Sequence, residues 1–145
     1  MRKEDLTVPA IIAEAVEIIV GVIYIGLQIY YGFANHVPPY KFICNIVGLI
    51  LVYAGLSIAG NHPERVNRIP AEMCVGEVRK YTLRMLRVVK FVFVAGLMIP
   101  CIWDVVGMDM KEGYSLIVPG LILLIAVWYE YKILLVIRKN RDDKK

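Results

Sequence analysis

The chain has 145 residues, of which 59% are hydrophobic, and it carries a formal net charge of +4. Soluble domains average about 45–50% apolar residues, so this composition, with a mean hydropathy of +0.61, argues against an ordinary soluble domain. The basic surplus does not indicate nucleic-acid binding, because the basic residues follow the distribution typical of membrane proteins.

Four long apolar runs are separated by short segments rich in proline, glycine and charge. A helix needs about 20 mostly apolar residues to cross a bilayer. The sequence therefore predicts an all-α integral membrane protein with four transmembrane helices arranged as two hairpins. We expect one domain over residues 1–145, with spans near residues 8–33, 41–60, 88–107 and 115–137.

The first run carries polar side chains at steps of three and four residues, which place them on one face of a helix. A polar stripe on a spanning helix must face other helices or water, because lipid cannot solvate it. We therefore expect this face to point into the protein. The stripe consists of Glu14, Glu17, Gly21, Tyr24, Gln28 and Tyr31.

The second run has a face of small residues with one asparagine. Small residues let helices approach closely, and asparagine can hydrogen-bond across the contact. We expect this face to pack inside the protein, and a dimer interface is the alternative. The face consists of Asn45, Gly48, Val52, Gly55 and Ala59.

Residues 70–90 form the one substantial segment outside the four apolar runs. Pro70 at a helix start with Glu72 in the first turn is typical of helix initiation, and basic residues then recur at helical spacing. The sequence predicts an amphipathic basic cytoplasmic helix between the second and third spans. Its cationic side chains are expected to contact anionic lipid or a protein partner, and they are Arg79, Lys80, Arg84 and Arg87.

Lys90 begins the third run and Glu130 lies late in the fourth, so both are expected near the depth of Glu14 and Glu17. One interpretation is a cluster of ion pairs that holds the helices together. The other is a polar vestibule whose carboxylates exchange protons or bind a cation. The candidate residues for this interior polar site are Glu14, Glu17, Tyr24, Gln28, Lys90 and Glu130. Further along the third run, Pro100 predicts a kink or a helix end.

Charge placement predicts the topology. All but two of the 17 basic residues lie near the chain ends or between the second and third runs, and the exceptions are Lys41 and Lys111. Cytoplasmic segments of membrane proteins collect Lys and Arg. We therefore expect a multi-pass plasma-membrane protein with both termini in the cytoplasm.

Residues able to carry catalysis or bind metal are scattered. Cys44, Cys74 and Cys101 lack CxxC spacing, so free thiols are expected, with a Cys44–Cys101 bridge as the alternative. His36 and His62 fall on opposite sides of the membrane in the expected topology. No nucleophile motif is present. We expect no catalytic residue, no metal site, no cofactor and no enzymatic activity.

The stretch AIIAEAVE, residues 10–17, resembles the first helix of small multidrug-resistance transporters, and this resemblance would make Glu14 a proton- and substrate-binding residue. The central loop is longer than in that family, and the third run lacks its aromatic motif. The stretch RIPAE, residues 68–72, is distantly similar to small membrane immunity proteins, whose further motifs are missing. No family is assigned on these residues.

The expected function is that of a small non-enzymatic membrane protein acting as an interaction, immunity or regulatory subunit. Its expected partners are the bilayer, with anionic lipids at the cytoplasmic face, and a second copy or another membrane protein. The alternative is a small oligomeric carrier or proton-coupled transporter that uses the carboxylates of the first helix. This alternative requires oligomerisation, because four short helices enclose little space.

Overall fold

The computed structural model describes residues 7–108 and 113–142, and every regular element in these ranges is a helix. In chain order the helices are α1 (Val8–Ala34), α2 (Pro39–Asn61), the short α3 (Pro63–Val66), α4 (Gly76–Val106) and α5 (Tyr114–Asp142). Four of them, α1, α2, α4 and α5, contain stretches long and apolar enough to cross a membrane. The all-helical fold with four candidate spans is therefore confirmed.

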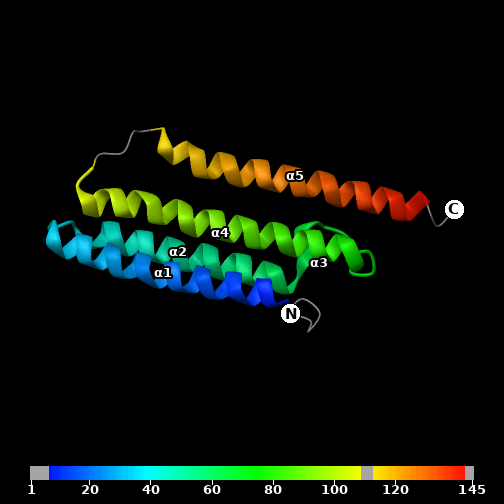
Figure 1. The fold of residues 1–145 in the computed structure, drawn as a ribbon, viewed down its shortest axis with the longest axis horizontal. Helices are drawn as coiled ribbons and strands as arrows, with labels where there is room; N and C mark the ends of the chain where they lie inside the picture. Colours follow the sequence, from blue (N-terminus) through cyan, green and yellow to red (C-terminus); the bar gives the residue numbers. More distant parts are fainter. Residues whose placement is uncertain (1–6, 109–112, 143–145) are drawn as a thin grey trace.

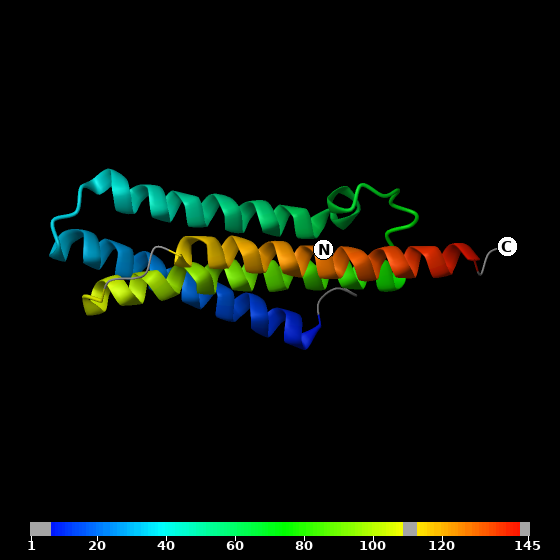
Figure 2. The same cartoon turned by 90° about the horizontal axis from the view of Figure 1, so that it is seen from above.

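Helix α4 occupies the centre of the molecule. It packs against α1, α2 and α5, and α1 and α2 also pack against each other. Figure 1 shows α5 on one side of α4, with α1 and α2 on the other. In the view from above, α2 runs along one side of α4, whereas α1 crosses α4 and begins on the opposite side from α2 (Figure 2). The expected bundle of four helices is thus organised as three helices around a core, with α5 on the outer side of α4.

The main core cluster joins α1, α2 and α4. Its buried members are Tyr24 from α1, Leu49 from α2, and Val94 and Cys101 from α4. Elsewhere the long helices expose many large apolar side chains, as expected for surfaces that face lipid. Because lipid tails are as apolar as these side chains, helix association depends on close packing and on polar contacts between helices.

Helix α1 starts where the sequence favours a start. Thr7 occupies the N-cap position in an extended conformation, and Pro9 follows in the first turn, where its missing N–H breaks no helical hydrogen bond. The buried residues of α1 lie along one face, which is the predicted inward face. They are Ala10, Glu17, Tyr24, Gln28 and Gly32.

Helix α2 packs through a different face from the predicted one. Its buried residues are Leu49 and Gly60, whereas a Cβ added at Gly48 or Gly55 would meet nothing within 4 Å. The expected internal packing of the small-residue face is therefore not found, although Asn45 bonds to α1. The larger side chains of the neighbouring face fill the space toward α1 and α4, which a pattern of small residues cannot reveal.

Helix α4 extends well before its apolar run. Residues 71–74 form turns and a bend, and a continuous helix then starts at Gly76, so the basic segment is the first part of α4 rather than a separate helix. Asn67, just after α3, donates to Thr82 Oγ1 at 2.6 Å. This bond holds the loop between α3 and α4 against α4. The helix ends at Val106 and is capped by Gly107, whose φ of 76° lies in the left-handed region that favours glycine.

Helix α4 also passes through Pro100 without ending there. Proline lacks an N–H, so the carbonyl of Gly96 loses its partner within the helix. The hydroxyl of Tyr114, at the start of α5, donates to that carbonyl at 3.1 Å. The absence of a side chain at Gly96 also allows Val118 to approach, since a Cβ there would lie 2.7 Å from Val118 Cγ1. Helices α4 and α5 thus meet closely at Gly96.

Candidate functional site

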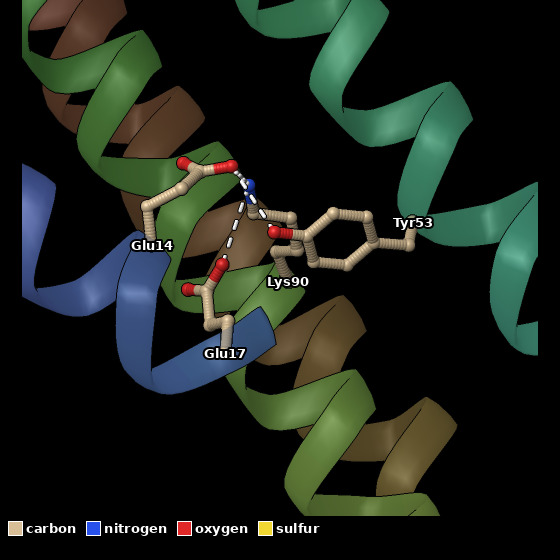
Figure 3. Close-up of polar contacts among 4 residues, drawn as sticks. All are labelled: Glu14, Glu17, Tyr53 and Lys90. Carbon is tan, nitrogen blue, oxygen red and sulfur yellow. Dashed lines mark hydrogen bonds and ion pairs between the residues drawn. The ribbon is translucent and has the colours of Figure 1, made fainter. Parts of the chain in front are cut away.

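Three helices bring a lysine, two glutamates and a tyrosine together. Glu14 and Glu17 come from α1, Tyr53 from α2 and Lys90 from α4, and Figure 3 shows their polar groups converging on the Lys90 ammonium. Helices α1 and α4 run side by side in the same direction (Figure 1). The early turns of α1 therefore lie beside the middle of α4. We call these four residues the Lys90 cluster.

The contacts in the Lys90 cluster are short and directional. Lys90 Nζ donates to Glu14 Oε1 at 2.7 Å and lies 3.2 Å from Glu17 Oε2. Tyr53 Oη donates to the same Glu14 Oε1 at 3.1 Å. The ammonium also lies 4.6 Å from the centroid of the Tyr53 ring, a distance at which cation–π attraction operates. One ammonium thus links α4 to α1 and α2.

The members of the cluster differ in burial. The side chain of Lys90 is 6% exposed and that of Glu17 is 1% exposed, whereas the Glu14 side chain is 34% exposed. A charge in such surroundings is costly unless an opposite charge lies beside it. Lys90 and Glu17 therefore depend on each other, and Glu14 is the member that water or another molecule can reach.

The cluster has two carboxylates for one ammonium. Neither oxygen of Glu17 accepts a hydrogen bond from the residues that the structure describes, so its contact with Lys90 is an ion pair without hydrogen-bond geometry. Arg87 precedes Lys90 by three residues and lines a cavity together with Glu14 and Lys90. The positive charge near the two carboxylates is therefore supplied by α4.

A second polar contact joins the same three helices farther along α1. Gln28 Nε2 donates to Cys101 Sγ at 3.3 Å, and Asn45 Nδ2 donates to Gln28 Oε1 at 3.1 Å. Gln28 is eleven residues after Glu17, or roughly 16 Å along a helix at 1.5 Å per residue. The predicted stripe on α1 is thus divided into two polar groups, with the buried Tyr24 in the apolar core between them.

Glu130 does not join the Lys90 cluster. It is half-buried on α5, and in the described part of the chain no ion pair or hydrogen bond connects it to Glu14, Glu17 or Lys90. Its neighbour Lys132 lies over the rings of Tyr81 and Trp128 instead. The expected topology predicted only how deep Glu130 lies in the membrane. Glu130 is separated from the Lys90 cluster because α5 packs on the opposite side of α4 from α1 and α2 (Figure 1).

Sequence reasoning also missed two residues. Tyr53 belongs to the Lys90 cluster, and Cys101 belongs to the second polar group. A tyrosine in the middle of an apolar run is a usable signal, because a buried hydroxyl needs a partner. No comparable signal points to Cys101, which resembles an ordinary small apolar side chain.

Among the hollows near the Lys90 cluster, two adjoin each other toward the start of α4. The first, which we call the apolar cavity, has a volume of about 480 Å³ and lies among α1, α2 and α4. The second, the basic pocket, has a volume of about 350 Å³. It brings together the four cationic side chains predicted to contact lipid or a partner, which are Arg79, Lys80, Arg84 and Arg87.

The described residues contain no group of three or more His, Cys, Asp or Glu side chains placed to hold a metal ion. Cys44 is exposed, Cys74 and Cys101 are buried, and no disulfide joins any of the three. The alternative of a bridge between Cys44 and Cys101 is therefore not found. The contacts described for the Lys90 cluster and for the second polar group are ion pairs, hydrogen bonds and apolar packing.

Comparison with known proteins gives no relative. The chain matches no protein-family model, no curated protein and no solved structure.

Proposed function

We propose that the chain is a small, non-enzymatic, multi-pass protein of the plasma membrane that acts as an interaction, immunity or regulatory subunit. The observation that carries the proposal is the position of Lys90. Its ammonium pairs with Glu14 and Glu17 and lies over the Tyr53 ring. In this proposal the charged residues within the spans hold three helices together, and the function lies in the outer surfaces of the bundle.

We further propose a topology of two hairpins with both termini in the cytoplasm. Support comes from the basic residues at the start of α4 and at the end of α5, because Lys and Arg collect on the cytoplasmic side. The start of α1, the start of α4 and the end of α5 lie at the same end of the molecule (Figure 1). Arg2, Lys3, Lys111, Lys144 and Lys145, which also entered the topology prediction, lie outside the described residues.

The uncovered face of α2 supports an interaction role. A Cβ at Gly48 or Gly55 would meet nothing within 4 Å, and Val52 between them is 40% exposed. In membranes, close approach of small residues is a main source of helix association. In this proposal a second copy or another membrane protein packs its helix against this face.

Photo-crosslinking in native membranes tests the interaction role. A photoreactive amino acid at Val52 is expected to form covalent adducts with another polypeptide, seen as a larger band in denaturing gels. The matched control places it at Leu49, which is 4% exposed on the inward face of the same helix, and only the monomer band is expected there. The proposal is contradicted if Val52 yields only monomer in native membranes.

A carrier or proton-coupled transporter is the second candidate, favoured by one observation. Two carboxylates share one ammonium, and the buried Glu17 accepts no hydrogen bond from the described residues. Such a carboxylate has room for a proton or a small cation. Proteoliposomes report this function directly, since a pH gradient should be dissipated by the wild type and not by Glu17→Gln. A strictly monomeric protein in mild detergent would count against this function.

A further inference from the structure

The apolar cavity and the basic pocket adjoin each other. Both are lined by Leu83 and Arg87, which lie about one turn apart on α4. The apolar cavity extends from this boundary toward the Lys90 cluster, and the basic pocket extends toward Gly76 at the start of α4. The two hollows therefore lie next to each other and have walls of different chemistry.

The apolar cavity suits a hydrocarbon chain. Ile11 and Ile18 of α1, Leu56 of α2 and Leu86 of α4 contribute to its wall. The acidic residue on this wall, Glu14, is already paired with Lys90 at 2.7 Å. The volume of about 480 Å³ is within the range of small-molecule sites, which is about 300–1,000 Å³.

The basic pocket suits a phosphate group. Arg79, Lys80, Arg84 and Arg87 all line it, and none of the lining residues within the described ranges is acidic. Guanidinium groups bind phosphate oxygens through paired N–H donors, and lysine adds a compact positive charge. Gly76, in the first turn of α4, also lines the pocket, and a helix N-terminus attracts anions further.

We propose that the two hollows together bind one anionic phospholipid, with its phosphate in the basic pocket and part of an acyl chain in the apolar cavity. The proposal rests on charge complementarity at one end and on apolar walls at the other. It goes beyond the proposed function and does not depend on it, because a protein without a protein partner could still bind this lipid.

Native mass spectrometry of delipidated protein tests the site. The expected result is a one-to-one adduct with phosphatidylglycerol that is at least about tenfold tighter than the adduct with phosphatidylcholine. Inorganic phosphate alone should neither bind comparably nor displace the lipid. Equal binding of the two lipids would contradict selection of an anionic headgroup by the basic pocket. Full displacement of the lipid by inorganic phosphate would contradict a contribution of the acyl chain to binding.

Two kinds of variant locate the site. The pair Lys80→Gln and Arg84→Gln removes two exposed charges from the pocket, and each basic residue near a lipid surface contributes to the attraction of anionic lipid. The matched control pair Arg138→Gln and Lys139→Gln removes the same charge from the end of α5. Phosphatidylglycerol affinity should fall at least about tenfold in the first pair and less than about twofold in the control, and equal losses would overturn the proposal.

A third variant tests the cavity without changing charge. Ala15 lines the apolar cavity and is itself exposed, so Ala15→Trp fills the space without crowding a packed core. It should weaken phosphatidylglycerol binding while leaving circular dichroism and the thermal midpoint of the lipid-free protein unchanged. Unchanged lipid affinity in this variant would overturn the assignment of the acyl chain to the cavity.

Discussion

Lys90 links three of the long helices. Its ammonium contacts Glu14 and Glu17 on α1, and it lies over the ring of Tyr53 on α2. Burying an ion is costly, and removing one partner of a buried pair leaves the other uncompensated. The effect of a substitution in this cluster on stability should therefore depend on which charged partner remains.

The first prediction concerns Tyr53. Tyr53→Phe removes the hydroxyl that donates to Glu14 but keeps the ring beside the ammonium, so the free energy of unfolding should fall by about 0.5–1 kcal/mol. Tyr53→Leu removes the ring as well and should cost more. Detergent-induced unfolding in lipid bicelles measures both. Tyr30→Phe, at an exposed tyrosine of α1, serves as the control and should have little effect. Equal losses for the Phe and Leu variants at Tyr53 would show that the ring contributes nothing.

Part of this cluster could be predicted because charges are conspicuous in apolar runs. Helical spacing put Glu14 and Glu17 on the inward face, and their expected depth matched that of Lys90. The same reasoning wrongly grouped Glu130 with them, since depth does not specify on which side of α4 a helix packs. Tyr53 was missed because its hydroxyl becomes informative only when its partner is known.

At the scale of helices, the contact between α4 and α5 depends on Gly96 and Pro100. The proline frees a carbonyl, Tyr114 donates to it, and the glycine lets Val118 approach. The sequence predicted a kink or an end at Pro100, and the helix does not end there but continues to Val106. A hydrogen-bond donor on another helix satisfies the free backbone carbonyl there. Sequence periodicity does not identify such a donor.

A methyl group at Gly96 should disturb this contact. Gly96→Ala would place a Cβ about 2.7 Å from Val118, so the free energy of unfolding should fall by about 1–3 kcal/mol, as for other overpacked sites. Gly26→Ala is the matched control, because a Cβ there meets nothing within 4 Å. Unfolding in bicelles measures both variants. Equal stabilities for the two would contradict the close approach of α5.

Tyr114 and Pro100 should act on the same carbonyl. Tyr114→Phe alone leaves the Gly96 carbonyl without its donor and should cost about 0.5–1.5 kcal/mol. In a Pro100→Ala background the helix regains an N–H for that carbonyl, so the same exchange should cost less. A double-mutant cycle in bicelles measures the difference. Identical costs in both backgrounds would show that the tyrosine does not compensate for the proline.

At the scale of the whole molecule, the number of candidate spans followed directly from the apolar runs, because spanning length is set by bilayer thickness. Packing order was not accessible in the same way. Lipid-facing and protein-facing positions are both apolar, so sequence does not distinguish them. In the structure α2 packs through a different face from the predicted one, and the extensive contacts described for α5 are with α4. The two hollows depend on this packing and had no sequence signal beyond the basic residues.

The proposed topology makes a prediction about accessibility. In a background in which the three native cysteines are replaced, His36→Cys lies between α1 and α2 and should react with a membrane-impermeant maleimide added outside intact cells. Lys139→Cys, near the end of α5, should react only after the membrane is permeabilised. Labelling of both positions from outside, or the reverse pattern, would contradict cytoplasmic termini.

The central claim is that Lys90 and Glu17 hold α4 and α1 together as a buried ion pair. The most direct test is a double-mutant cycle of Glu17→Gln and Lys90→Met, with unfolding measured in lipid bicelles. Each single exchange should destabilise the protein, and the pair should cost less than the two added, with a coupling of about 1–3 kcal/mol. The same cycle with Glu130→Gln in place of Glu17→Gln should be additive. Additivity within about 0.5 kcal/mol for the Glu17 cycle would contradict the claim.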